Sequence, residues 1–139
     1  MSGLVVDASV AAKWVVNEPD SALARRLFGR GDIMAPDLIW AELGSVLWRR
    51  QRVGELSALE AREMMFDLRR LPVTVYAIFP LLPLALEIAM AIRHSIYDCV
   101  YLALADQQDC RFVTADRRFR SAIAAGPWAP SVISLSEME

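Results

Sequence analysis

Four carboxylates stand where predicted strands and helices meet. Asp7 ends the first apolar run of the chain, and Asp116 follows the fourth such run by two residues. Asp98 lies in the first turn of a predicted helix, and Glu42 lies in the second turn of the helix after the second run. Because parallel strands end at one edge of a sheet, we expect all four carboxylates to face one crevice there.

A cluster of this kind requires protonation or a bound cation. Two carboxylates 4 Å apart repel by roughly 4 kcal/mol at an effective dielectric constant near 20. Oxygen ligands suit a hard divalent ion, Mg²⁺ or alternatively Mn²⁺. Zinc does not fit, because His94 is the only histidine and has no His or Cys at ligand spacing. We expect His94 to be a helix-end cation or a surface residue. A pair of divalent ions held by carboxylates is suited to phosphodiester hydrolysis, because one ion activates a water and the other stabilises the leaving oxygen.

Each carboxylate also has a structural interpretation. Asp7 or Ser9 caps a helix, with Ser9 the expected N-cap, and Asp116 caps the last helix. Asp98 completes a capping box begun by Ser95. Glu42 differs because Leu38, Ile39 and Val46 surround it at helical spacing, which places it on an apolar stripe. A buried charge needs a partner, and both Arg49 and a cation shared with the other acids remain candidates.

Short apolar runs alternate with helical patterns throughout. Strands are predicted at 4–6, 33–35, 73–76, 111–114 and 132–133. Helices are predicted after Ser9, from Pro19 to about Phe28, at 37–53, after a Ser57-x-x-Glu60 capping box, at 84–93, after Ser95 and at 116–124. In the helix after the capping box, the residues expected to point inward are Ala61, Met64, Met65 and Leu68. This alternation predicts one α/β domain over 1–139, with three α/β/α layers around a parallel sheet of four to five strands.

Composition narrows the function classes. The 139 residues are 55% apolar and 23% charged, which supports a packed core and excludes a disordered chain. Cys99 and Cys110 are too few for a disulfide framework, so we expect a reducing, cytoplasmic location. No signal peptide is expected. Segment 71–92 has the length of a membrane span, but its three prolines favour a strand, a turn and an amphipathic helix instead.

Four segments carry a resemblance to a known family. They are Val5-Val6-Asp7-Ala8-Ser9, the stretch 36–42, the stretch 97–105 and the stretch 112–119. In order, spacing and total length they resemble the signature blocks of PIN-domain ribonucleases, and in particular the VapC toxins of type II toxin–antitoxin systems. The match covers essentially the whole chain.

The resemblance implies a Mg²⁺-dependent endoribonuclease that forms a homodimer and is inhibited by a VapB-type antitoxin. It implies catalytic and metal-ligand roles for Asp7, Glu42, Asp98 and Asp116, with auxiliary hydroxyls at Ser9 and Thr114. Some PIN nucleases carry a further acid directly after the fourth, whereas here Arg117 and Arg118 follow Asp116. The number of metal ions, one or two, stays open.

An acidic protein needs a local basic surface to hold RNA. The net charge is −2, and fourteen of the fifteen basic residues are arginine, which favours bidentate phosphate contacts. We expect Lys13, Arg49, Arg117 and Arg118 to flank the acidic crevice and to bind RNA. The four tryptophans are expected in the core or at a subunit interface.

Two other functional classes are consistent with parts of the sequence. A non-catalytic acidic-pocket module would be either a degenerate PIN domain or a receiver-like domain. A receiver-like domain needs a lysine at the end of a late strand, but the only lysine, Lys13, follows the first strand. A membrane-associated or structural partner protein rests on segment 71–92 alone. The four carboxylates and the resemblance favour the nuclease.

Overall fold

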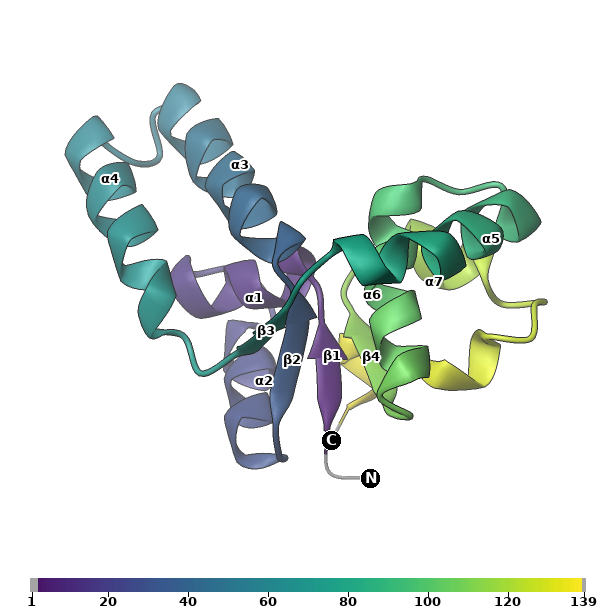
Figure 1. The fold of residues 1–139 in the computed structure, drawn as a ribbon. Helices are drawn as coiled ribbons and strands as arrows, with labels where there is room; N and C mark the ends of the chain where they lie inside the picture. The colour runs from purple at the N-terminus through teal and green to yellow at the C-terminus, as the bar shows by residue number, and fades with distance from the viewer. Residues whose placement is uncertain (1–2, 139) are drawn as a thin grey trace.

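A five-stranded parallel sheet lies at the centre of the molecule (Figure 1). The computed structural model describes residues 3–138. The strands are β1 (Leu4–Val6), β2 (Ile33–Pro36), β3 (Thr74–Tyr76), β4 (Arg111–Thr114) and β5 (Val132–Ser134), in the order β3-β2-β1-β4-β5. All four pairings are parallel, which confirms the predicted sheet.

Helices fill every connection between the strands. They are α1 (Ala8–Val15), α2 (Ser21–Arg25), α3 (Leu38–Arg52), α4 (Ala58–Asp67), α5 (Leu82–Ile92), α6 (Ile96–Gln107) and α7 (Arg117–Ala122), with short 3-10 turns between some of them. The predicted second helix is shorter than expected, because residues from Arg26 to Gly29 form a 3-10 turn instead.

The strand order reverses direction at β1, which creates a crevice. The chain moves outward from β1 through β2 to β3, and then returns to the opposite side of β1 as β4 and β5. Val5 therefore lies between Met34 of β2 and Phe112 of β4. At such a switch point the connections leave in opposite directions, which opens a binding crevice beyond the carboxyl ends of β1 and β4.

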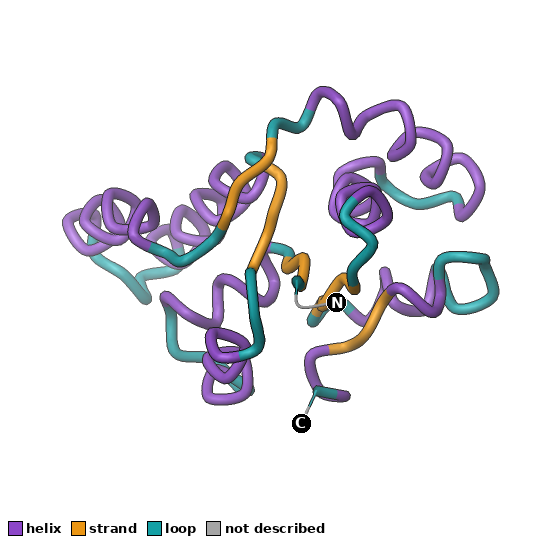
Figure 2. The backbone as a smooth tube through the Cα atoms, turned by 60° about the horizontal axis from the view of Figure 1, so that its bottom comes forward, coloured by secondary structure: helices purple, strands orange, loops and turns teal. Residues whose placement is uncertain are grey.

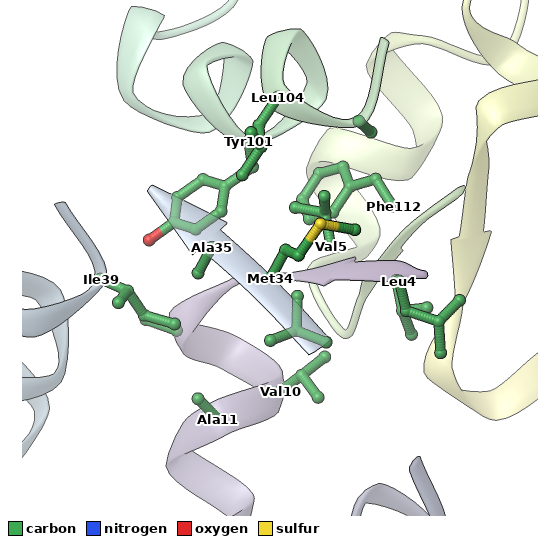
Figure 3. Close-up of a cluster of buried hydrophobic side chains, with 14 of the residues drawn as sticks. Leu4, Val5, Val10, Ala11, Met34, Ala35, Ile39, Tyr101, Leu104 and Phe112 are labelled. Atoms are coloured by element: carbon green, nitrogen blue, oxygen red, sulfur yellow. The ribbon is translucent and has the colours of Figure 1, made fainter. Parts of the chain in front are cut away.

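Two helical layers cover the sheet. Helix α6 packs against β1, β2 and β4, and α5 packs against α6. Figure 3 shows Tyr101 and Leu104 of α6 on one side of β1 and β2, and Val10 and Ala11 of α1 on the other. This arrangement confirms the three-layer α/β/α architecture. Strand β1 is buried along its whole length, as the apolar run predicted.

Two predictions about helix N-termini were wrong. Asp7, and not Ser9, is the N-cap of α1, since its side chain accepts a hydrogen bond from the Val10 amide. The capping box expected between Ser95 and Asp98 does not form. The Ser95 hydroxyl accepts from the Tyr97 amide, whereas the Asp98 carboxylate contacts His94. The Ser57–Glu60 box at the start of α4 is confirmed.

Helices α3 and α4 form a hairpin, seen side by side in Figures 1 and 2. Gly54 lies in the turn after α3 with φ of +86°, a conformation that side chains with a Cβ rarely adopt. The prediction that Met65 points inward was wrong, because its side chain is 43% exposed. The hairpin thus leaves apolar surface uncovered in this chain.

The segment of membrane-span length forms separate elements. In residues 3–138 no single helix is both long and apolar enough to cross a membrane. Phe79–Ile92 and Ile96–Gln107 reach the criterion only as a pair, and this pair is bent by 119°.

Candidate active site

Asp7 lies at the carboxyl end of β1, beside the end of β4. It follows β1 directly, and only 7% of its surface is exposed. Its Oδ1 accepts hydrogen bonds from the Ser9 hydroxyl (2.5 Å) and the Val10 amide (3.2 Å). Its Oδ2 accepts from the Thr114 hydroxyl at the end of β4 (2.5 Å). The carboxylate is therefore held by donors on both sides.

The two hydroxyls also join the ends of the strands. Ser9 Oγ accepts from the Ala115 amide, and Thr114 Oγ1 accepts from the Asp116 amide, both at 3.0 Å. Each hydroxyl thus accepts from the backbone of the β4–α7 turn and donates to Asp7. The structure thus brings both Ser9 and Thr114, the two hydroxyls that the resemblance pointed to, into contact with Asp7.

Burial changes the acidity of Asp7. Loss of solvent raises the pKa of its carboxyl from 3.8 to about 6. The hydrogen bonds from Ser9, Thr114 and Val10 oppose this change, and the negative charge of Asp98 adds to it. At pH 7 and above Asp7 is predominantly ionised, so it can act as an anionic ligand.

Glu42 comes from α3 and is half-buried. The Tyr101 hydroxyl donates a hydrogen bond to Glu42 Oε1. Burial raises the pKa of Glu42, the bond from Tyr101 lowers it, and the charge of Asp98 raises it. Arg49, one of the two candidate partners, donates to the Ser45 hydroxyl instead (3.0 Å). The hydrogen-bond partner of the half-buried Glu42 carboxylate is therefore Tyr101, which is 59 residues away in the sequence.

Asp98 comes from the first turn of α6 and pairs with His94. The distance from His94 Nε2 to Asp98 Oδ2 is 2.6 Å. Of the two expectations for His94, the surface residue was wrong, because its side chain is only 19% exposed and contacts one of the predicted acids. His94 does lie just after the end of α5, as expected for a helix-end residue. The four-residue spacing between His94 and Asp98 was the signal in the sequence.

Tyr101 hydrogen-bonds Glu42 and lies within electrostatic range of Asp7 and Asp98. Its side chain is fully buried, and burial raises its pKa above the ordinary value for a phenol. The charges of Glu42, Asp7 and Asp98 raise this pKa further. Three carboxylates from three different elements therefore act on the same hydroxyl. Tyr101 was not among the predicted site residues, although it lies three residues after Asp98 on the same helix face.

Asp116 has a different environment from the other three. Its Oδ1 accepts from the amides of Arg118 (2.9 Å) and Phe119 (3.3 Å), so it is the N-cap of α7. Asp116 therefore caps α7, as its structural interpretation predicted. Asp116 also lines a cavity of about 790 Å³ together with Glu42 and Ser9.

One wall of this cavity is basic. It is formed by Lys13, Arg49, Arg50 and Arg52. Glu18 forms ion pairs with both Lys13 and Arg50, and Glu55 forms a second one with Arg50. Within the described residues, Arg49 meets no carboxylate at ion-pair distance, so its charge is available to a ligand.

The second predicted basic cluster lies elsewhere. Arg117 and Arg118 are exposed on α7, and they are not among the described residues that line the cavity. The geometry therefore associates Lys13 and Arg49 with the acids more directly than Arg117 and Arg118.

The donor set suits a hard divalent cation by type and charge. Asp7, Glu42 and Asp98 supply only oxygen, and two of them have a raised pKa to which Asp98 contributes. A cation would relieve this mutual repulsion. As their side chains are placed, however, no three His, Cys, Asp or Glu residues between 3 and 138 are grouped closely enough to hold an ion. The oxygens of these three acids are engaged by protein donors instead.

Fold and site together define a class: a doubly wound α/β protein with carboxylates at the switch point of a parallel sheet. Comparison with known proteins makes this class specific. The PIN domain family model matches residues 4–124. Ribonuclease VapC9 of Mycobacterium tuberculosis is 36% identical over 83% of this chain and 87% of its own length. Ribonuclease VapC1 of the same species is 33% identical over 97% of this chain and 98% of its own. The chain therefore belongs to the PIN-domain family and, within it, to the VapC proteins.

Solved structures agree on the fold. PAE2754 from Pyrobaculum aerophilum superposes with a TM-score of 0.69 at 21% identity, covering 96% of this chain and 91% of its own. VapBC2 from Rickettsia felis, bound to a promoter DNA fragment, superposes with a TM-score of 0.65 at 11% identity, covering 95% of this chain and 98% of its own. At these identities the likeness concerns the fold alone.

Proposed function

We propose that the protein is a divalent-metal-dependent endoribonuclease and the toxin of a type II toxin–antitoxin pair. The observation that carries the proposal is Asp7 at the end of β1, held by the hydroxyls of Ser9 and Thr114, next to a cavity lined by Glu42 and Asp116. The relatives named ribonucleases support the reaction type. A solved neighbour described as a VapBC assembly, together with a second described as a toxin–antitoxin complex, supports the biological role.

Each residue has a role in this proposal. Asp7, Glu42 and Asp98 would hold Mg²⁺ (or Mn²⁺), and Asp116, which lines the same cavity as Glu42, would contribute a fourth carboxylate. The ion would activate water and stabilise the leaving oxygen of the phosphodiester. Ser9 and Thr114 fix the Asp7 carboxylate by donating to its two oxygens. The number of ions, one or two, depends on whether Asp116 also takes part.

The basic wall would hold the RNA backbone. Arg49 presents a planar guanidinium on the same cavity as Glu42, and such groups bind phosphate in a bidentate manner. Lys13 and Arg50 are engaged by Glu18, so they would contribute less. Arg117 and Arg118 would contact more distant phosphates. The raised charge density next to the acids attracts an anionic substrate to an otherwise acidic protein.

Exposed apolar residues support further partners. Leu59 and Phe66 on α4 and Phe79 and Met90 around α5 are each more than half exposed. Apolar surface of this kind marks protein interfaces. We assign it to a homodimer and to a VapB-type antitoxin, acting in the cytoplasm. Light scattering of the protein alone and with its antitoxin tests this assignment.

An RNA cleavage assay tests the enzyme directly. The wild type is compared in Mg²⁺ and in EDTA, and with the variants Asp7→Asn and Asp98→Asn. The matched control is Asp106→Asn, an exposed carboxylate on the same helix as Asp98. We expect cleavage by wild type and control in Mg²⁺, and none in EDTA or by the two site variants. Equal cleavage by all four proteins in EDTA would refute the mechanism.

A binding-only PIN domain is distinguished by a second measurement. Calorimetric titration with Mn²⁺ reports whether the acids bind an ion regardless of the substrate. Metal binding that depends on Asp7, combined with no cleavage across a broad RNA panel, would favour the non-catalytic alternative.

A further inference from the structure

The only histidine of the chain is fixed at the start of α6. Helix α5 ends at Ile92, and Arg93 adopts a left-handed conformation with φ of 56°. The His94 amide then donates to the Ala89 carbonyl (3.2 Å), and Ser95 caps α6. The left-handed residue ends α5, and His94 follows it directly, four residues before Asp98.

The imidazole ring is held on two sides. Its Nε2 lies 2.6 Å from Asp98 Oδ2. Its edge meets the ring of Phe119 at a centroid distance of 5.1 Å and an angle of 69°. Phe119 is buried in α7, and it packs in turn on Phe112 of β4. The ring therefore has a fixed position relative to the core, which a surface histidine would not have.

The direction of the hydrogen bond follows from its acceptor. A carboxylate oxygen is an acceptor, so this contact assigns the hydrogen to Nε2 of His94, which donates to Oδ2. A charge-assisted bond of this length restricts rotation of the Asp98 side chain. The orientation of Asp98 matters to the whole site, because its charge acts on Asp7, Glu42 and Tyr101.

We propose that His94 is a positioning residue, which fixes the orientation of the Asp98 carboxylate by donating from Nε2 to Oδ2. The inference rests on the proposed function, because it assigns His94 a role in the same acidic site. His94 binds neither the ion nor the RNA in this account. It acts as the outer partner that hydrogen-bonds a ligand and so fixes its direction.

Two substitutions separate the hydrogen bond from the packing. His94→Leu keeps an apolar side chain against Phe119 and removes the donor. His94→Gln places an amide N–H₂ at about the reach of Nε2 and so keeps the donor. Far-UV circular dichroism and thermal unfolding first establish that both variants fold.

Mn²⁺ binding at fixed pH, measured by calorimetry, is the primary readout. Loss of such an outer partner typically weakens metal affinity about 10- to 100-fold. We expect His94→Leu to fall into this range and His94→Gln to recover most of the wild-type affinity. Equal affinity of His94→Leu and wild type would overturn the proposal. So would equal losses in both variants, because the packing and not the donor would then be responsible.

The single histidine allows a second, direct readout. One pair of ring ¹⁵N resonances reports which nitrogen is protonated in the wild-type protein. A hydrogen on Nε2 supports the proposal, whether or not Nδ1 also carries one, and a ring protonated on Nδ1 alone overturns it.

The two readouts distinguish the inference from the proposed function. A wild-type protein that binds no Mn²⁺ would refute both. A wild type that binds Mn²⁺ with a dependence on Asp7, beside a His94→Leu variant of equal affinity, would refute the role of His94 and leave the nuclease proposal intact.

Discussion

Replacing Asp7 by asparagine is expected to change how the stability of the protein depends on pH. Burial raises the pKa of Asp7 to about 6, from 3.8. A difference of about 2.2 between these values, at about 1.4 kcal/mol for each, corresponds to about 3 kcal/mol. Asp7 is buried, so solvent screening removes little of this figure.

The sign follows from proton linkage. The folded protein binds the Asp7 proton more tightly than the unfolded chain, because the folded pKa is the higher one. The contribution of Asp7 to stability is therefore fully present below about pH 3.8 and is lost as the pH rises through about 6. Asparagine has no proton to lose, so the Asp7→Asn variant is free of this loss.

Urea unfolding at pH 5 and pH 8 measures the effect. Between these values the wild type is expected to lose about 1.4 kcal/mol through Asp7, which follows from the same linkage relation. The difference in free energy of unfolding between Asp7→Asn and wild type should grow by that amount. Any constant cost of altered hydrogen bonds to Ser9 and Thr114 cancels, because it is present at both pH values.

A matched control and a metal titration sharpen this test. Asp106→Asn removes an exposed carboxylate, so its difference from wild type is expected to be nearly the same at both pH values. At pH 8, saturating Mg²⁺ should stabilise the wild type more than Asp7→Asn, because a ligand of the folded state shifts the unfolding equilibrium. A difference for Asp7→Asn that stays constant or shrinks from pH 5 to pH 8 would refute the reasoning.

Three further predictions concern other parts of the site and fold. Tyr101→Phe removes the hydroxyl that donates to Glu42, which should cost about 1.5–3 kcal/mol in urea unfolding. It also removes a group that lowers the pKa of Glu42, so the acidic limb of the cleavage profile should move to higher pH. Arg49→Glu should weaken RNA binding more than Arg118→Glu in fluorescence anisotropy, with a salt slope lower by about 1. Ser57→Ala breaks the capping box of α4 and should lower the stability by about 1 kcal/mol in thermal unfolding.

Each of these predictions has a contrary outcome. An unchanged acidic limb in Tyr101→Phe would mean that Glu42 does not limit the reaction. Equal losses of RNA affinity in the Arg49 and Arg118 variants would mean that RNA crosses α7 as well as the basic wall. An unchanged melting temperature of Ser57→Ala would mean that the first turn of α4 contributes nothing to global stability.

Local patterns in the sequence predicted the architecture well. The run 4–6 favoured a strand buried on both faces, and the Ser57–Glu60 spacing marked the start of α4. These features depend on neighbours within a few residues, so the sequence carries them directly. The boundaries of α2 and the inward face of α4 were less accurate, because they depend on what packs against them.

The sequence by itself determined which residues are candidates for the chemistry, whereas the tertiary structure decided their partners. Asp7, Glu42, Asp98 and Asp116 were identifiable because each follows a strand or lies in an early turn of a helix. Their environments were not identifiable in the same way. Glu42 had two candidate partners in the sequence, and its actual donor comes from a helix on the other side of the crevice.

The partners of His94 and of the basic residues also depend on tertiary contacts. A histidine at a helix end is ambiguous until the ring of Phe119, 25 positions further along, fixes its orientation toward Asp98. Likewise, Arg49 and Arg118 both follow a predicted acid, but only the former lines the cavity. Periodicity records which face of an element is apolar. Which charges meet across a crevice depends on contacts between distant segments, and these exist only once the sheet has assembled.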